Sequence, residues 1–244
     1  MNKSKFEANQ EIERFVLEKT TPYTEADIAY INGYIGYGGM WNMDTTLAKE
    51  RGFYEYYTPT PVVEKMIGLA HKYGYQRGPV IEPSCGTGRF LHYFSPATEL
   101  TAIELDRTSY LIAKANFPTF NILNQYFNEL FVDRRGNARS PQASNQLVIG
   151  NPPYGAFSGK FTNYEKSVTK ANTYVDYFVS RGLDLLVLGG LLVYIIPSAF
   201  LDGQPTKVQQ LIYQKGELID AYRLPNGLFE QTDIQTDIVV FKKK

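Results

Sequence analysis

The stretch Val80-Ile81-Glu82-Pro83-Ser84-Cys85-Gly86-Thr87-Gly88 decides the fold of this 244-residue chain. A short apolar strand ends on an acidic residue, and two glycines follow in a turn. Such glycines let a ligand approach the backbone closely. A dinucleotide fingerprint would need a third glycine at position 91, which is Leu91, and Glu82 would repel a pyrophosphate. The segment therefore favours a cationic, phosphate-free cofactor at the end of a strand.

A second acidic residue, Glu104, ends the next apolar run, 22 residues after Glu82. At that place in a nucleotide-binding fold an acidic residue accepts hydrogen bonds from both ribose hydroxyls. Either glutamate alone is more often a surface or capping carboxylate. Together, at the ends of successive strands, they favour a ligand site. Cys85 has no candidate base nearby in the sequence, so we interpret it as a packing residue and not as a nucleophile.

Short apolar runs alternate with helical stretches from residue 79 onward. The runs are residues 79–83, 99–105, 120–124, 145–151, 191–197 and 236–241. Helices are expected over residues 5–18, 87–95, 107–116 and 173–187. A further helix should begin after Thr24, which serves as its N-cap, and another should run from the prolines at 59 and 61 to about Gly74. No obvious helix separates residues 218–222 from 237–241, so these are expected to pair antiparallel at a sheet edge. The alternation predicts an α/β fold with a mostly parallel sheet.

The segment Asn151-Pro152-Pro153-Tyr154 directly follows an apolar run. In a parallel sheet it lies at the carboxyl end of a strand, on the edge where the glycine turn also opens. The prolines fix φ and carry no N–H, so the segment presents carbonyl oxygens without competing donors. The amide oxygen of Asn151 and the carbonyl of Pro152 could each accept one hydrogen of an exocyclic amine. A simple proline turn is the alternative, and the motifs upstream disfavour it.

The composition excludes several kinds of site. One cysteine and two histidines are too few for a disulfide or most metal clusters, so no metal is expected. No apolar run approaches the roughly 20 residues that span a bilayer, and residues 1–10 lack the apolar core of a signal peptide. A cytoplasmic protein without a membrane partner follows. Basic and acidic residues balance at 25 each, which argues against strong DNA binding by this chain alone.

With these motifs the sequence resembles the N6-adenine-specific DNA methyltransferases, in particular their gamma group, in which the cofactor motifs precede NPPY. The resemblance covers residues 52–242. It implies a Rossmann-like S-adenosylmethionine-dependent methyltransferase fold, with a seven-stranded sheet and an antiparallel edge hairpin. Residues 21–40 resemble the leader of methylases encoded by phages and mobile elements, which implies a prokaryotic or phage origin. We expect a helical extension over residues 1–51 and a catalytic domain over 52–244.

The resemblance also implies roles for individual residues. Those implied for S-adenosylmethionine are Tyr57, Thr58, Pro59, Glu82, Pro83, Cys85, Gly86, Gly88, Glu104, Leu105, Phe127 and Phe178. Those implied for catalysis are Asn151, Pro152, Pro153 and Tyr154. Tyr154 and Phe229 would hold opposite faces of a flipped-out adenine, and methyl transfer would be direct, without a covalent enzyme intermediate. One departure is the segment 124–127, Asn-Gln-Tyr-Phe, where the family often has an acidic residue for the cofactor adenine.

Three alternatives stay open at this point. A protein glutamine N5 methyltransferase presents the same planar NH2 group to the same acceptors, and so does an RNA adenine methyltransferase. A noncatalytic cofactor-fold module of a restriction or mobile-element complex belongs to a different class. No separate target-recognition domain is visible, so we expect DNA recognition to need a specificity subunit or a further segment.

Overall fold

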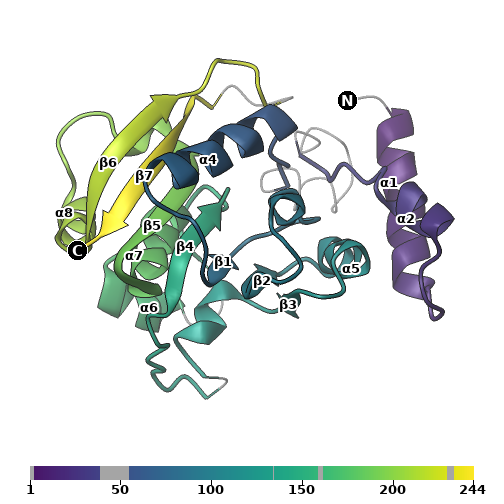
Figure 1. The fold of residues 1–244 in the computed structure, drawn as a ribbon, viewed down its shortest axis with the longest axis horizontal. Helices are drawn as coiled ribbons and strands as arrows, with labels where there is room; N and C mark the ends of the chain where they lie inside the picture. The colour runs from purple at the N-terminus through teal and green to yellow at the C-terminus, as the bar shows by residue number, and fades with distance from the viewer. Residues whose placement is uncertain (1–2, 39–54, 134, 159–161, 230–233) are drawn as a thin grey trace.

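Seven strands form one sheet in the order β3-β2-β1-β4-β5-β7-β6 (Figure 1). The structure is a computed structural model that describes residues 3–38, 55–133, 135–158, 162–229 and 234–244. The strands are β1 (Val80–Glu82), β2 (Leu100–Glu104), β3 (Asn121–Asn124), β4 (Asn145–Gly150), β5 (Leu186–Pro197), β6 (Gly216–Arg223) and β7 (Thr236–Lys243). The first five run parallel, whereas β7 pairs antiparallel with both β5 and β6. The expected α/β fold, with its antiparallel edge pair, is confirmed.

Helices cover both faces of the sheet, and β5 shows how the sequence specifies this. Its residues are apolar without interruption from Leu191 to Ile196, as in a strand buried on both sides. Val193 and Ile195 pack in the core on the side of α4 (Thr60–Lys72). Leu192 and Tyr194 pack in the core on the side of α7 (Tyr174–Asp184) and α8 (Lys207–Lys215), so the strand joins the two cores (Figure 1).

Most of the expected helices are present. Helix α1 (Lys3–Glu18) covers the expected 5–18, α5 (Arg107–Asn116) matches 107–116, and α7 begins where expected and ends at Asp184. Thr24 caps α2 (Glu25–Ile31) in a capping box with Asp27, which confirms the expected start. Helix α6 (Thr162–Thr169) was not expected. Within the described ranges, no helix is both long and apolar enough to cross a bilayer.

The helix expected over residues 87–95 is wrong. This segment forms turns and one short 3-10 helix, η1 (Leu91–Tyr93). Gly86 and Gly88 both have positive φ, 54° and 90°, so the backbone cannot enter an α-helix before residue 89. Pro96 then disfavours a helical residue just before it. Too few residues remain between the two for a stable helix.

The N-terminal helices pack against α5, at one side of the sheet (Figure 1). Phe6, Ile12 and Val16 of α1 form a small apolar cluster with Ile112 of α5. The Thr108 hydroxyl of α5 also donates to the Glu13 carboxylate of α1 at 3.2 Å. The boundary expected at residues 51 and 52 lies outside the described residues, so the division into an extension and a catalytic domain stays a prediction.

Parallel pairing brings the carboxyl ends of β1, β2 and β4 to one edge of the sheet. Glu82 pairs with Ala102, two positions before Glu104. Ile81 pairs with Val148, two positions before Gly150. This edge is where open α/β sheets bind ligands, and it carries both acidic residues and the start of the Asn-Pro-Pro-Tyr segment.

A buried ion pair attaches α6 to α7. Arg181 Nε lies 2.7 Å from Glu165 Oε2, and Arg181 Nη2 donates to Glu165 Oε1 at 2.8 Å. The Glu165 side chain has no exposed surface, and the Arg181 guanidinium lies 4.3 Å from the centroid of the Phe131 ring. Because the Glu165 carboxylate is withdrawn from water, it depends on this partner.

Replacing Arg181 with methionine should therefore cost about 3–5 kcal/mol of unfolding free energy, since a buried carboxylate loses its counter-ion. Urea unfolding followed by circular dichroism measures the difference. Arg139, whose side chain is exposed and bonded to the carbonyl of Glu129, offers the matched control Arg139→Met. Equal losses in the two variants would contradict the assigned role of the pair.

Candidate active site

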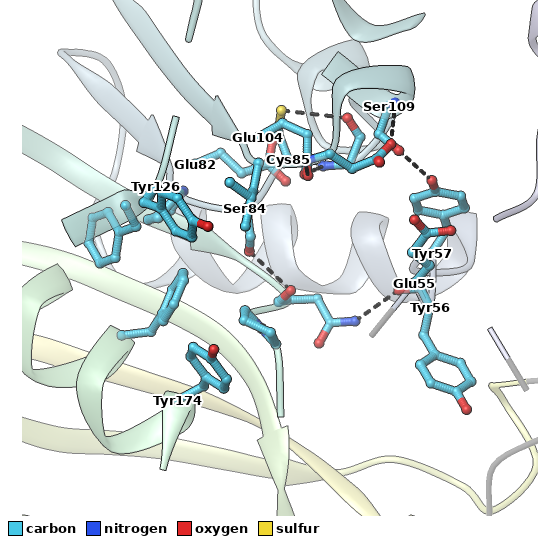
Figure 2. Close-up of a pocket in the computed structure, with 18 of the residues that line it drawn as sticks. Glu55, Tyr56, Tyr57, Glu82, Ser84, Cys85, Glu104, Ser109, Tyr126 and Tyr174 are labelled. Atoms are coloured by element: carbon cyan, nitrogen blue, oxygen red, sulfur yellow. Dashed lines mark hydrogen bonds between the residues drawn. The ribbon is translucent and has the colours of Figure 1, made fainter. Parts of the chain in front are cut away.

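A cavity of about 690 Å³ opens at the carboxyl edge of β1, β2 and β4 (Figure 2). Twelve of the residues predicted for the site line it: Tyr57, Thr58, Glu82, Pro83, Cys85, Gly86, Glu104, Leu105, Phe127, Asn151, Pro153 and Phe178. Five predicted residues are absent from its lining: Pro59, Gly88, Pro152, Tyr154 and Phe229. The structure therefore brings the acidic residues and Asn151 to one cavity of ligand size.

Glu104 is held in place by two backbone donors. Gly86 N donates to Oε2 and Asp106 N to Oε1, each at 2.7 Å. Burial raises the pKa of this carboxyl to about 7, although the two backbone hydrogen bonds favour the charged form and lower it. Each oxygen has a second lone pair, so the carboxylate can still accept from ligand hydroxyls.

Glu82 is almost fully buried, with 1% of its surface exposed. Its Oε2 has no hydrogen-bond partner among the described residues. Burial and the neighbouring Glu104 raise its pKa well above the usual value. An enclosed carboxyl group of this kind calls for a donor or a cation from a ligand.

The glycines of the turn meet aromatic rings. A Cβ added to Gly86 would lie 2.7 Å from Cε1 of Tyr57, and one added to Gly88 would lie 2.7 Å from Cε2 of Phe117. The sequence predicts that these glycines let a ligand approach the backbone. In the structure they instead make room for the side chains of Tyr57 and Phe117. Tyr57 is fixed in turn, because its hydroxyl lies 2.9 Å from Ser109 Oγ (Figure 2).

Asn151 directly follows β4, and three of its polar atoms are hydrogen-bonded. Its main-chain oxygen accepts from Ser84 Oγ at 3.2 Å, and its Oδ1 accepts from the Tyr154 hydroxyl at 2.8 Å. Its Nδ2 donates to the carbonyl of Tyr56 at 3.4 Å. Because a carbonyl only accepts, this last contact fixes which end of the amide is Oδ1.

Several lining residues were not singled out from the sequence. Aromatic examples are Tyr126, Phe157, Tyr174 and Tyr177, and the polar ones include Ser84, Ser109 and Gln125. Phe157 and Tyr177 stack, with ring centroids 4.2 Å apart. Tyr174, Tyr177 and Phe178 lie at positions i, i+3 and i+4 of α7, a spacing visible in the sequence.

Other predicted residues lie around the cavity. Pro59 is the N-cap of α4, and its carbonyl accepts from Val62 N and Val63 N. Phe229 is 8% exposed and packs in the core on the α4 side. Its role beside a bound adenine stays a prediction. In the segment that departs from the family, Gln125 and Tyr126 line the cavity, while Asn124 donates to the carbonyls of Glu104 and Leu105.

The Eco57I restriction-modification methylase family matches residues 98–229, which is more than half of the chain. The chain belongs to this family. The match includes Glu104 and the whole Asn-Pro-Pro-Tyr segment.

Individual relatives agree with this assignment. The chain is 30% identical to "Defense against restriction protein B" of Escherichia phage P1 over 223 residues, which is 90% of this chain and 9% of that protein. It is 27% identical over 211 residues to the EcoEI type I restriction enzyme methylase subunit of Escherichia coli, covering 78% of this chain and 42% of the subunit. The chain thus spans less than half the length of these relatives.

A solved structure shows the same fold. A Listeria monocytogenes protein, assigned to the class I S-adenosylmethionine-dependent methyltransferases, superposes with a TM-score of 0.63 at 15% identity. The match covers 98% of this chain and 79% of that one. The Rossmann-like methyltransferase fold expected for a restriction-modification methylase is therefore confirmed.

The residues of this chain fit the cofactor that its fold implies. The unpartnered oxygen of Glu82 needs a donor, and Glu104 adds a second carboxyl to the same cavity. S-adenosylmethionine carries a sulfonium and an ammonium, so it brings positive charge and no phosphate. Phe127 and Phe178, with ring centroids 4.8 Å apart, supply an aromatic wall of the kind that packs against an adenine ring.

Titration of Glu104 predicts a pH-dependent affinity of the chain for S-adenosylmethionine. Ribose hydroxyls donate best to the ionised carboxylate, so affinity should fall as pH drops through about 7 and the group takes up a proton. Isothermal calorimetry between pH 6 and pH 8 measures this dependence. Glu104→Gln removes that titration and should bind more weakly with a shallower slope. A variant slope as steep as the parent's would count against the assignment.

Proposed function

We propose that the chain transfers a methyl group from S-adenosylmethionine to the N6 amino group of adenine in DNA. The observation that carries this proposal is that one cavity joins the carboxylates of Glu82 and Glu104 to the side chain of Asn151. Carboxylates suit a cationic methyl donor, and an amide oxygen suits a target amine. Both halves of an amine methylation therefore meet in one enclosed space.

On this proposal Glu82 would accept from the cofactor ammonium and Glu104 from its ribose hydroxyls. The rings of Tyr126, Phe127 and Phe178 would surround its adenine. When bound, the cofactor supplies an electrophilic methyl group on sulfur. The protein's own contribution is to orient that group and to exclude water from it.

The target amine would lie against Asn151. Its Oδ1 already accepts from the Tyr154 hydroxyl, and one lone pair remains for an amine hydrogen. The carbonyl of Pro152 would accept the other hydrogen, and Pro153 behind it has no N–H to compete. Two fixed acceptors would draw the amine nitrogen toward tetrahedral geometry, so that its lone pair could attack the methyl carbon as the methyl–sulfur bond breaks. The sulfur would leave as a neutral thioether, and one amine hydrogen would be released as a proton.

DNA is the proposed substrate because the family and the relatives carry the names of restriction and modification enzymes, whose target is DNA. Such a base must leave the duplex to reach an enclosed site, and the rings of Tyr154 and Phe229 are the proposed partners of its two faces. With 25 basic and 25 acidic residues the chain has no excess of positive charge to bind phosphates. We propose that a specificity subunit or a further segment supplies most of the affinity for DNA. We propose that the protein works in the cytoplasm of a prokaryotic host.

Transfer of a labelled methyl group tests the proposal. The purified chain is incubated with tritiated S-adenosylmethionine and, separately, with duplex DNA, RNA or bacterial protein. Label in DNA, recovered as N6-methyladenine after nuclease digestion, is the expected result. If calorimetry detects no cofactor binding, the proposed enzymatic function is wrong. If the label is confined to RNA or to glutamine, the proposed substrate, DNA, is wrong.

Asn151→Ala should abolish methyl transfer and leave cofactor affinity within about twofold of the parent, since only an acceptor of the target amine is lost. Single-turnover transfer and calorimetric Kd separate the two effects. Asn121→Ala is the matched control, because Asn121 is exposed on edge strand β3 and bonds only Thr101 among the side chains described. Parallel loss of transfer and cofactor binding in Asn151→Ala would contradict its assigned role.

A further inference from the structure

We propose that Ser84 is a positioning residue, whose hydroxyl ties the cofactor loop to the catalytic segment through the main-chain carbonyl of Asn151. This inference rests on the proposed function and concerns how its two halves are held in register. Ser84 Oγ donates to Asn151 O at 3.2 Å, across 67 positions of sequence (Figure 2). Ser84 would act through Asn151 and not on the amine itself.

The loop that carries Ser84 is firmly held. Cys85 N donates to the carbonyl of Ile103 at 3.0 Å, and Gly88 N donates to Cys85 O at 2.8 Å. Gly86 N donates to the Glu104 carboxylate on the other side. The backbone around Ser84 is therefore anchored to the last two residues of β2, so its hydroxyl approaches Asn151 from a fixed point.

The catalytic segment, by contrast, is short of backbone donors. The β1–β4 pairing extends through Ile81 and Val148, so its register ends before Glu82 and Asn151. Pro83 on one side and Pro152 and Pro153 on the other have no N–H to continue it. A side-chain hydroxyl at position 84 supplies the donor that the backbone lacks.

Holding the Asn151 carbonyl places the proposed acceptor of Pro152. It fixes the peptide plane between Asn151 and Pro152, and the ring of Pro152 then fixes φ for the next carbonyl. The side chain of Asn151 is oriented separately by the Tyr154 hydroxyl and the Tyr56 carbonyl. With the Ser84 bond lost, the Asn151–Pro152 peptide plane and the Pro152 carbonyl would move relative to the cofactor loop.

The decisive variant is Ser84→Ala, with Ser84→Thr as the rescue that restores a hydroxyl. Ser84→Ala should lower the single-turnover rate of methyl transfer by about tenfold, because a small misplacement of reacting groups is costly. Its Kd for S-adenosylmethionine should stay within about twofold. Ser84→Thr should recover most of the rate. Ser95→Ala, in an exposed turn where Ser95 accepts from Ala97 N, should match the parent.

A second readout needs neither cofactor nor activity. Hydrogen–deuterium exchange of the backbone amides of residues 154–157 should be faster in cofactor-free Ser84→Ala than in the parent, and Ser84→Thr should restore slow exchange. An unchanged exchange pattern overturns the proposal, as does a fall in rate that is matched by an equal rise in Kd. If the parent chain transfers no methyl to any acceptor, the proposed function itself fails, and the exchange result shows separately whether the Ser84 link exists.

Discussion

The carboxylate of Glu104 is the point on which the cofactor half of the site depends. One oxygen accepts from Gly86 N and the other from Asp106 N, so a single side chain fixes the glycine loop and the entry to α5. Asp106 in turn caps α5 by accepting from Ser109 N, and the Ser109 hydroxyl meets that of Tyr57. The Tyr57 ring then closes over Gly86. These contacts connect Glu104, Asp106, Ser109, Tyr57 and Gly86 in a ring, so each part of the cavity wall is held by its neighbours.

This arrangement places two carboxyl groups in one cavity, and the electrostatic consequence is specific. Burial raises the pKa of both Glu82 and Glu104, and the neighbouring Glu104 raises the pKa of Glu82 further. Positive charge from a ligand relieves both effects, whereas a phosphate would aggravate them. The residues that build the wall therefore also favour a cationic cofactor over a dinucleotide.

The apolar runs predicted the parallel sheet because the central strands β4 and β5 are buried on both faces along Leu147–Ile149 and Leu191–Ile196, which read as continuous apolar stretches. The two glutamates and Asn151 could be predicted because parallel strands end at one edge. The absence of a helix at 87–95 could not be predicted, because it follows from positive φ at Gly86 and Gly88, where the rings of Tyr57 and Phe117, distant in sequence, pack against the turn. The role proposed for Ser84 could not be predicted for a similar reason, because its hydrogen-bond partner lies 67 positions away in the sequence.

The chemistry and the affinity for substrate are supplied by different features of such a protein. A flipped base costs a few kcal/mol of lost stacking and pairing before any reaction occurs. Phosphate contacts are the usual means of offsetting that cost, and a chain with 25 basic and 25 acidic residues gains little from them overall. The proposed acceptor Asn151 is nonetheless held by contacts within this chain, from Ser84, Tyr154 and Tyr56. We therefore expect a partner or further segment to govern where DNA is modified, while the rate of the chemical step belongs to these residues.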